Sequence, residues 1–391
     1  MTSLAAPADT QLLLDALLAD APEGRDALEV LRPEVLAHTR AAYGALYREP
    51  QALPIPVLHA LAAVTADWQG SGPLAEWHRA QGASAALTVA DPLTEEPALA
   101  ALRDHVDLLS ISPALVTQAD QEHLAAAGHD PRTAVLISQL VAFESYLQRL
   151  VAGLAALHGL EVPAADAPVR APRSRGRIAQ HGGTTPSGRA RPSAFTREQL
   201  QWEPWIDVPA EDELTDEQRD SFASKASTNS VYFRMLSLTP AITRARSELD
   251  NAIFLPRDGL PKAERELAAA ATSKVNDCIY CASVHARKAA ALAKRESEVD
   301  ALLAAELERD ADWIASALTP LAAGQDERWS ALVTAAAELS RPRPSGVPIA
   351  PLRALGLSDP EIADLLGAAA FFAWANRLML SLGDPALPDT P

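Results

Sequence analysis

The 391-residue chain contains few cysteines, few aromatic residues and too few basic residues to balance its acidic ones. It has 34 Lys and Arg against 51 Asp and Glu, which gives a formal net charge of −17 at pH 7. Because phosphate binding relies on clustered Lys and Arg, this balance argues against a surface that binds nucleic acid or an anionic membrane. We therefore expect no nucleic-acid or membrane partner, and the acidity favours solubility.

Targeting and membrane-spanning signals are also missing from the sequence. The first residues, MTSLAAP, do not form a basic segment followed by an apolar core, so no secretory signal is evident. No uninterrupted apolar stretch approaches the roughly 20 residues that a transmembrane helix needs. We expect a cytoplasmic protein, in which a cysteine pair would rest reduced and suit catalysis better than a structural disulfide.

Strand-forming residues are sparse, which favours an all-α fold. Aromatic residues make up 5% of the chain, and Ala and Leu are prominent in the 48% that is hydrophobic. Apolar residues recur at helical spacing in 12–18, 53–68 and 134–157. Capping-box sequences at 215–218 and 358–361 predict further helix starts. The sequence therefore predicts helical bundles throughout.

Residues 162–197 differ from the rest of the chain in composition. They contain five prolines, four glycines and seven arginines, with Asp166 as the single acid. This composition predicts a flexible linker between a helical domain at 1–161 and a second one at 198–391. The basic run from Arg170 to Arg191 is either a solvated tether or a docking segment for an acidic partner or nucleic acid.

Both cysteines of the chain lie in one short segment, for which we predict two helices joined by a tight turn. Pro261 suits the first turn of an Ala-rich helix, and Asn276 and Asp277 predict a break followed by an N-cap. The second helix is expected to begin at Cys278, so that Cys278 and Cys281 lie in its first turn. The positive end of the helix macrodipole would then lower the pKa of these thiols.

Two further side chains bring acid–base chemistry to the thiols. His285 follows Cys281 by four residues, so both lie on one helix face and can exchange a proton. Glu266 comes from across the turn, where it could orient the imidazole or act as a base through a water. A zinc site would need four ligands, and the sequence has no second cysteine pair. The segment therefore predicts a redox site, in which two thiols at this spacing can close a disulfide.

The spacing of Glu266, Cys278, Cys281 and His285, E-x11-C-x2-C-x3-H, resembles the signature of the alkyl hydroperoxidase D branch of the carboxymuconolactone decarboxylase superfamily. The resemblance covers roughly the last 180 residues in obvious form. It implies that Cys281 attacks a peroxide as the thiolate, that Cys278 resolves the product to a disulfide, and that Glu266 and His285 relay protons. It also implies an antioxidant homo-oligomer without metal or flavin, reduced by an external lipoyl- or thioredoxin-type protein.

An internal repeat extends the likeness to the N-terminal half. The halves align without a gap at an offset of 207 residues, and at an offset of 228 near their ends. The most informative matches are Pro33 with Pro240, Pro54 with Pro261, His78 with His285, and Arg149 with Arg377. We infer a duplication, so that two fused domains in one chain would resemble one dimer of the single-domain relatives.

The repeat also predicts which half carries the chemistry. In the N-terminal half the four motif positions are occupied by His59, Ser71, Leu74 and His78, and only the last keeps its identity. This half cannot form a disulfide or a sulfenic acid, so we expect a non-catalytic domain that covers and shapes the active half. A ligand pocket around His59, Ser71 and His78 is the alternative to simple packing.

The last apolar segment, residues 371–378, contains Asn376 and Arg377. We expect Arg377 to form a buried or interfacial salt bridge. Tyr280, between the cysteines, and Trp374 either line the mouth of the site or pack in the core.

Three functions are consistent with these residues. The first is peroxide reduction by Cys281 and Cys278. The second is a disulfide oxidoreductase or redox sensor without peroxide turnover, which multiple cycles with an organic peroxide would distinguish from the first. The third is proton-transfer chemistry of the carboxymuconolactone decarboxylase type, which needs no cysteine pair and would survive alkylation of the thiols.

Overall fold

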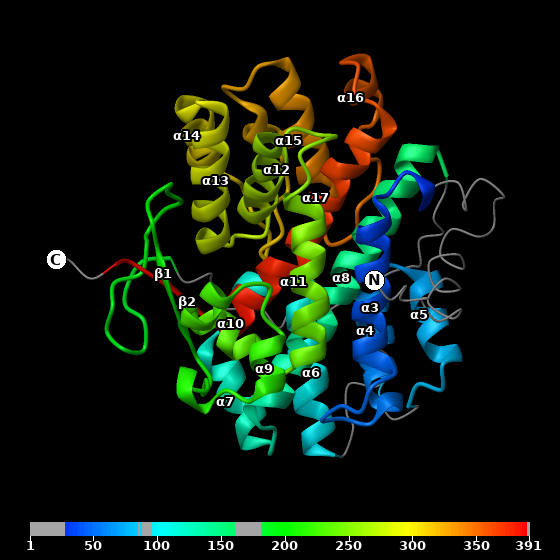
Figure 1. Ribbon diagram of the computed structural model, residues 1–391, viewed down its shortest axis with the longest axis vertical. Coiled ribbons are helices and arrows are strands. Elements are labelled where there is room, and N and C mark those ends of the chain that lie inside the picture. Colours follow the sequence, from blue (N-terminus) through cyan, green and yellow to red (C-terminus); the bar gives the residue numbers. More distant parts are fainter. Residues whose placement is uncertain (1–27, 85–86, 88–95, 161–180, 389–391) are drawn as a thin grey trace.

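The computed structural model describes residues 28–84, 87, 96–160 and 181–388 (Figure 1). These residues are mostly helical, as predicted. The helices of the N-terminal half are α3 (Pro33–Tyr47), α4 (Ile55–Trp68), α5 (Gly72–Ala80), α6 (Pro97–Ile111), α7 (Gln118–Ala126) and α8 (Pro131–His158). Those of the C-terminal half are α9 (Asp216–Asp220), α10 (Val231–Leu236), α11 (Pro240–Phe254), α12 (Lys262–Val275), α13 (Ile279–Ala293), α14 (Glu296–Ala304), α15 (Glu327–Leu339), α16 (Ala350–Ala354) and α17 (Asp359–Leu382). Two short strands, β1 (Gln201–Pro204) and β2 (Gly383–Ala386), pair antiparallel.

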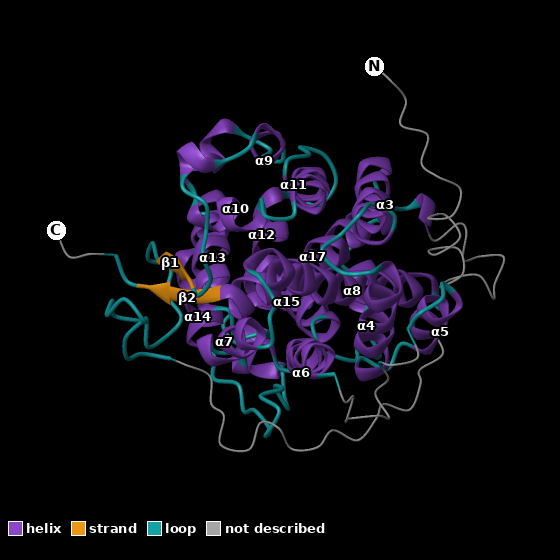
Figure 2. Cartoon of the chain, turned by 90° about the horizontal axis from the view of Figure 1, so that it is seen from below, coloured by secondary structure: helices purple, strands orange, loops and turns teal. Residues whose placement is uncertain are grey.

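Two long helices, α8 and α17, form the centre of the fold. They lie side by side in both views (Figures 1 and 2), and most of their residues are buried. The Asp130 side chain caps α8 by accepting a hydrogen bond from the Thr133 N–H at 2.8 Å. The predicted capping box of Ser358 and Glu361 opens α17. By length and composition both helices could cross a membrane, but 89% and 94% of their most apolar windows are buried inside the protein.

The two halves do not separate into two bundles. α17 packs against α8 as well as against α12, and α3 packs against α11. Each half therefore contributes a long apolar helix that the other half covers, and the core is continuous between them. The described residues therefore do not show the expected two tandem bundles joined by a flexible linker, although the N-terminal helices do pack against the C-terminal ones.

Two buried arginines connect the halves reciprocally. Arg377 on α17 donates to the Leu109 carbonyl at 3.1 Å and to the Ser110 carbonyl at 2.9 Å, at the end of α6. Arg149 on α8 donates to the Arg341 carbonyl at 2.9 Å, just beyond α15. Among the described residues neither guanidinium pairs with a carboxylate, so the salt bridge predicted for Arg377 is wrong. Both instead bind carbonyls at helix C-terminal ends, where the macrodipole favours a cation.

Helix boundaries follow the internal repeat. The bounds of α3 and α11 differ by the 207-residue offset at both ends, as do those of α4 and α12, and α8 and α17 begin at the second offset of 228. Gly70 (φ 71°) and Asp277 (φ 63°) correspond in the alignment, and both have a left-handed backbone. The alignment made from residue identities therefore coincides with the observed helix ends.

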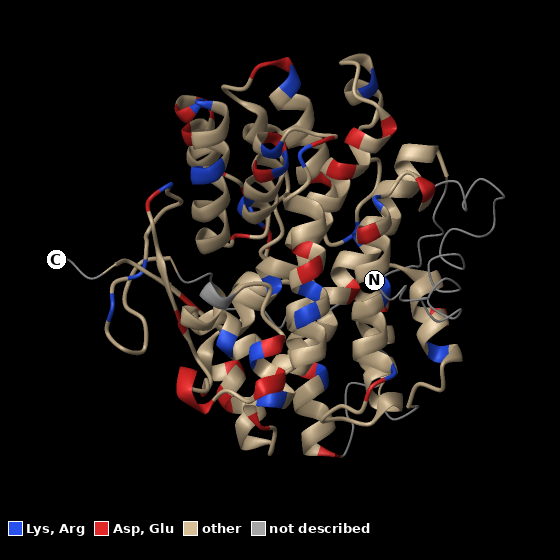
Figure 3. Cartoon of the chain, viewed as in Figure 1, with Lys and Arg blue, Asp and Glu red and all other residues tan. Residues whose placement is uncertain are grey.

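The described part of the predicted linker, residues 181–197, lies against the C-terminal half. His181 contacts Asp277 at 3.0 Å, and Arg197 pairs with Asp300 at 2.5 Å. The expectation of a solvated tether is therefore not met here, because these basic side chains reach carboxylates of the same chain. Residues 162–180 lie outside the described residues. Along the helices, Lys and Arg are interspersed with Asp and Glu and do not gather on one element (Figure 3).

Candidate active site

A tight turn between α12 and α13 carries the cysteine pair. The N–H of Cys278 donates to the Ser273 carbonyl at 2.8 Å, and the N–H of Asp277 to the Lys274 carbonyl at 3.3 Å. This is a Schellman motif, in which the left-handed residue, Asp277, reverses the chain at the end of α12. The predicted pair of helices is confirmed, but the second begins one residue later than expected, with Cys278 as its N-cap.

The side chain of Asp277 is held by three neighbours. It accepts a hydrogen bond from Trp313 Nε1 at 2.7 Å, and it lies 3.0 Å from His181 Nε2 and 3.8 Å from Arg309. Burial alone would raise the pKa of Asp277, but His181 and Arg309 keep it below its usual value. Glycine is the usual residue in this conformation, as at Gly70. The aspartate therefore places a negative charge beside Cys278 at a cost in backbone energy.

Glu266 and His285 form a short contact across the two helices. Glu266 Oε2 lies 2.5 Å from His285 Nδ1, and Lys288 Nζ lies 3.8 Å from the other carboxylate oxygen. Glu266 is fully buried, whereas 13% of the His285 side chain is exposed. Burial alone would raise the pKa of Glu266, but the hydrogen bond with His285 and the charge of Lys288 lower it below its usual value. The carboxylate thus fixes the imidazole through Nδ1 and leaves Nε2 for proton exchange.

Two aromatic side chains fix the other faces of this imidazole. The Phe372 ring on α17 meets the His285 ring edge-on, with 4.3 Å between centroids. The Phe254 ring on α11 lies 5.8 Å from it. His285 is therefore positioned by helices α11, α12 and α17 while it is carried by α13.

The two thiols are buried, and they do not form a disulfide in this structure. Cys278 is 2% exposed and Cys281 is 6% exposed. Burial raises the pKa of Cys278 well above its usual value, and its hydrogen bond with Cys281 raises it further. The expectation that the helix end lowers both pKa values is therefore wrong for Cys278, because loss of solvent outweighs the macrodipole. Burial therefore favours the neutral form of the Cys278 thiol.

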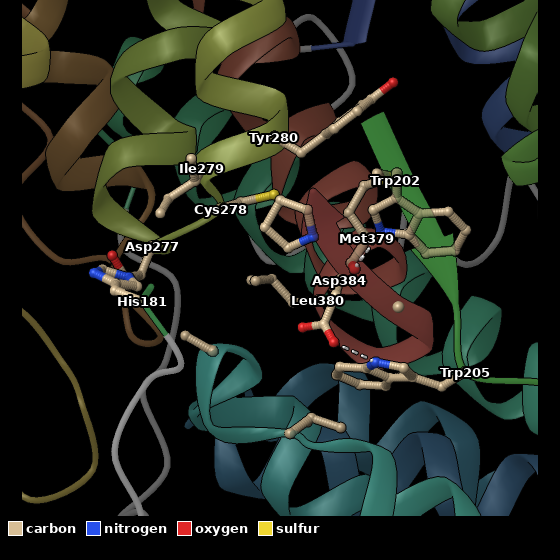
Figure 4. A pocket seen from close by; sticks show the side chains of 14 residues that line it. His181, Trp202, Trp205, Asp277, Cys278, Ile279, Tyr280, Met379, Leu380 and Asp384 are labelled. Carbon is tan, nitrogen blue, oxygen red and sulfur yellow. Dashed lines mark hydrogen bonds and ion pairs between the residues drawn. The ribbon is translucent and has the colours of Figure 1, made fainter. Parts of the chain in front are cut away.

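A small cavity of about 40 Å³ opens beside Cys278. Figure 4 shows this thiol facing a wall formed by Trp202 in β1, Trp205 just after β1, and Asp384 in β2. Trp205 Nε1 donates to Asp384 at 2.8 Å. Tyr280 also lines the cavity, which was one of its two expected positions.

Trp374 packs in the core, which was the second of its two expected positions. It is fully buried in α17, and its Nε1 atom donates to the Gln139 side chain at 2.8 Å. Trp374 is therefore a core residue at the contact of α17 with α8, and it does not line the cavity beside Cys278.

Residues 240–323 match the model of the Carboxymuconolactone decarboxylase family. This stretch is a domain of the Carboxymuconolactone decarboxylase family. The match extends from the start of α11 past α14 and contains all four motif residues, while the N-terminal half lies outside it. A search of curated proteins finds no match for this chain. Within the described residues, no group of three or more His, Cys, Asp and Glu side chains is placed to hold a metal ion.

Three side chains near the thiols of the carboxymuconolactone decarboxylase domain were not identified from the sequence. Tyr232 on α10, just before the domain, interacts electrostatically with both cysteines and with Arg246. Arg246 and Asp250 on α11 are one turn apart, which in sequence is typical of an exposed pair. Nothing in their spacing indicated that Arg246 would be 3% exposed. One of its close neighbours is the Phe371 ring on α17, which lies far away in the sequence.

The N-terminal counterpart of the site is a buried cluster without thiols. His59 Nδ1 lies 2.9 Å from His78 Nδ1, and Glu144 lies 3.2 Å from His78 Nε2. The Tyr47 hydroxyl donates to Glu144 at 2.5 Å. In this half the carboxylate comes from α8, at the position that Phe372 occupies in α17. The two histidines meet as the alignment predicts, and among the described residues their rings contact each other and the Tyr47 ring.

Proposed function

We propose that this protein is a thiol-dependent hydroperoxide reductase that uses Cys281 and Cys278. The Cys281 thiolate attacks the terminal peroxide oxygen, so that an S–O bond forms and the O–O bond breaks. Sulfur loses two electrons, and the leaving oxygen takes a proton to give an alcohol. Cys278 then attacks the sulfenic acid, which releases water and closes a disulfide.

The buried contact between Glu266 and His285, one helical turn from Cys281, is the observation that carries this proposal. A carboxylate-fixed imidazole can take the proton of the Cys281 thiol and return it to the leaving oxygen. The raised pKa of Cys278 also supports the assignment, because it makes this thiol the less suitable of the two to attack the peroxide first. The cavity beside Cys278 gives a route by which a reductant reaches the resolving sulfur.

We further propose that the chain is a fusion of two alkyl hydroperoxidase D-like domains, 1–161 and 198–391, of which only the second is catalytic. The matching helix bounds and the reciprocal contacts of α8 and α17 support this, because a fused dimer would cover its two long helices in the same way. An external lipoyl- or thioredoxin-type dithiol would reduce the disulfide, in a cytoplasmic homo-oligomer.

Cysteine variants test the function directly. Reduced wild-type protein should consume an organic hydroperoxide through several cycles when an external dithiol is supplied. Cys281→Ser should abolish consumption, whereas Cys278→Ser should stop after one turnover with a sulfenic acid on Cys281, trapped by dimedone and located by mass spectrometry. Consumption by Cys281→Ser at the wild-type rate would show that the assignment is wrong.

A disulfide oxidoreductase or redox sensor is the second candidate, favoured by the depth at which both thiols are buried. A sensor would be oxidised slowly and once, with a change in oligomer size. Decarboxylase-type proton transfer, named in the matched family, would instead persist after both thiols are alkylated.

A further inference from the structure

Two buried hydrogen-bond donors near the thiols have no acceptor among the described residues. Arg246 on α11 is 3% exposed, and its Nε and Nη1 atoms are buried without a hydrogen-bond partner. The hydroxyl of Tyr232 on α10 is buried without a partner as well. Because native proteins satisfy most buried polar groups, such a pair calls for a ligand or a chemical role.

Ring contacts place these donors at the edge of the thiol site. The Arg246 guanidinium lies 4.9 Å from the Phe371 ring centroid and 5.9 Å from that of Tyr232. Phe371 directly precedes Phe372, which holds the His285 ring. The pair therefore adjoins the same stretch of α17 that positions the proton relay.

Tyr232 links this arginine to the thiols. Its ring packs edge-on against Trp202, at 5.6 Å, in the wall of the cavity beside Cys278. Its hydroxyl interacts electrostatically with Cys281 and Cys278 as well as with Arg246. Burial raises the pKa of Tyr232 above its usual value, so the hydroxyl remains a donor throughout the neutral range.

Among the described contacts, no carboxylate forms an ion pair with the Arg246 guanidinium. Asp250, one turn further along α11, forms no ion pair with Arg246 among the described contacts, and burial raises the pKa of Asp250. The other charges that act on Asp250 belong to His285, Lys288 and Glu266, and Glu266 is already bonded to His285. Aromatic faces therefore supply the close contacts of Arg246.

The repeat offers an internal comparison for this position. Thr39 in the N-terminal half corresponds to Arg246. Its hydroxyl is fully bonded, to the Val35 carbonyl at 2.8 Å and to the Tyr146 hydroxyl at 2.7 Å. In the N-terminal half this position thus holds Thr39, whose hydroxyl is hydrogen-bonded. In the C-terminal half it holds Arg246, whose Nε and Nη1 atoms have no acceptor among the described residues.

We propose that Arg246 and Tyr232 form a donor site for the alkyl hydroperoxide, which holds the oxygen that becomes negative as its O–O bond breaks. The inference rests on the peroxide reduction proposed above. As Cys281 attacks the terminal oxygen, charge moves to the distal oxygen, which leaves as an alkoxide. Arg246 and Tyr232 stabilise that charge until the proton arrives from His285.

Two reagents separate this role from a structural one. Tyr232→Phe, Arg246→Lys and Arg246→Gln are compared in single-turnover oxidation by cumene hydroperoxide and in alkylation of Cys281 by iodoacetamide, which involves no oxygen leaving group. The ratio of peroxide rate to alkylation rate should fall about tenfold in Tyr232→Phe. It should fall about 100-fold in Arg246→Gln, with Arg246→Lys in between.

Tyr43→Phe is the matched control. It removes the hydroxyl that accepts from Trp77 in the N-terminal half, and it should leave the ratio unchanged. An unchanged ratio in Tyr232→Phe and Arg246→Gln, or an equal fall in both rates, overturns the donor site while peroxide reduction stands. A wild-type protein that forms no sulfenic acid overturns the proposed function itself.

Discussion

Replacing Glu266 by Gln tests the proton relay with almost no change in shape. Glu266 is fully buried, and its Oε2 atom lies 2.5 Å from His285 Nδ1. Two unit charges about 4 Å apart interact by about 4 kcal/mol at an effective dielectric constant of about 20. The imidazole carries only part of a charge in the transition state and is partly exposed. We therefore expect Glu266→Gln to lose about 2–3 kcal/mol of transition-state stabilisation, which slows the reaction roughly 30- to 150-fold.

The measurement is the rate of sulfenic acid formation on Cys281 in a stopped-flow experiment with an organic hydroperoxide. Glu264→Gln is the control, because Glu264 is also buried on α12 and binds Arg328 through both oxygens at 2.7 Å. That variant should lose stability but keep its rate. Equal slowing in the two variants, or a wild-type rate in Glu266→Gln, would refute the relay.

Two further predictions concern the thiols and the contact between the halves. Because the pKa of Cys278 is raised, its thiolate fraction at pH 8 lies below that of an ordinary cysteine, so iodoacetamide should label Cys281 first. Peptide mapping after partial alkylation checks this, and earlier labelling of Cys278 contradicts it. Arg377→Met should lower the free energy of unfolding by about 3 kcal/mol, since it leaves buried carbonyls of α6 without donors. An unchanged urea midpoint would show that these bonds contribute little.

The helical fold and the motif could be predicted because their signals are local. Helical periodicity, capping boxes and the i,i+4 spacing of Cys281 and His285 depend on residues within one or two turns. Glu266 could be placed because the turn between α12 and α13 is short. The internal repeat extended this reasoning to the helix bounds of the N-terminal half.

Features that depend on distant contacts could not be predicted. Arg377 binds carbonyls 267 and 268 residues away in the chain, so a salt bridge was the reasonable expectation from its neighbours alone. The raised pKa of Cys278 depends on burial, which the local helix-end argument omits, and the cavity beside this thiol is lined by residues as distant in the sequence as Trp202 and Asp384. Residue spacing likewise does not indicate that the Nε and Nη1 atoms of Arg246 lack acceptors among the described residues.

Arg149 and Arg377, which each bind carbonyls of the opposite half, make the two halves one folding unit. Each guanidinium completes a helix that the opposite half of the chain supplies, at α15 and α6 respectively. Separating the two halves would remove these hydrogen bonds from the C-terminal ends of α6 and α15. It would also expose the apolar faces of α8 and α17 to solvent. Neither half is thus a complete folding unit by itself.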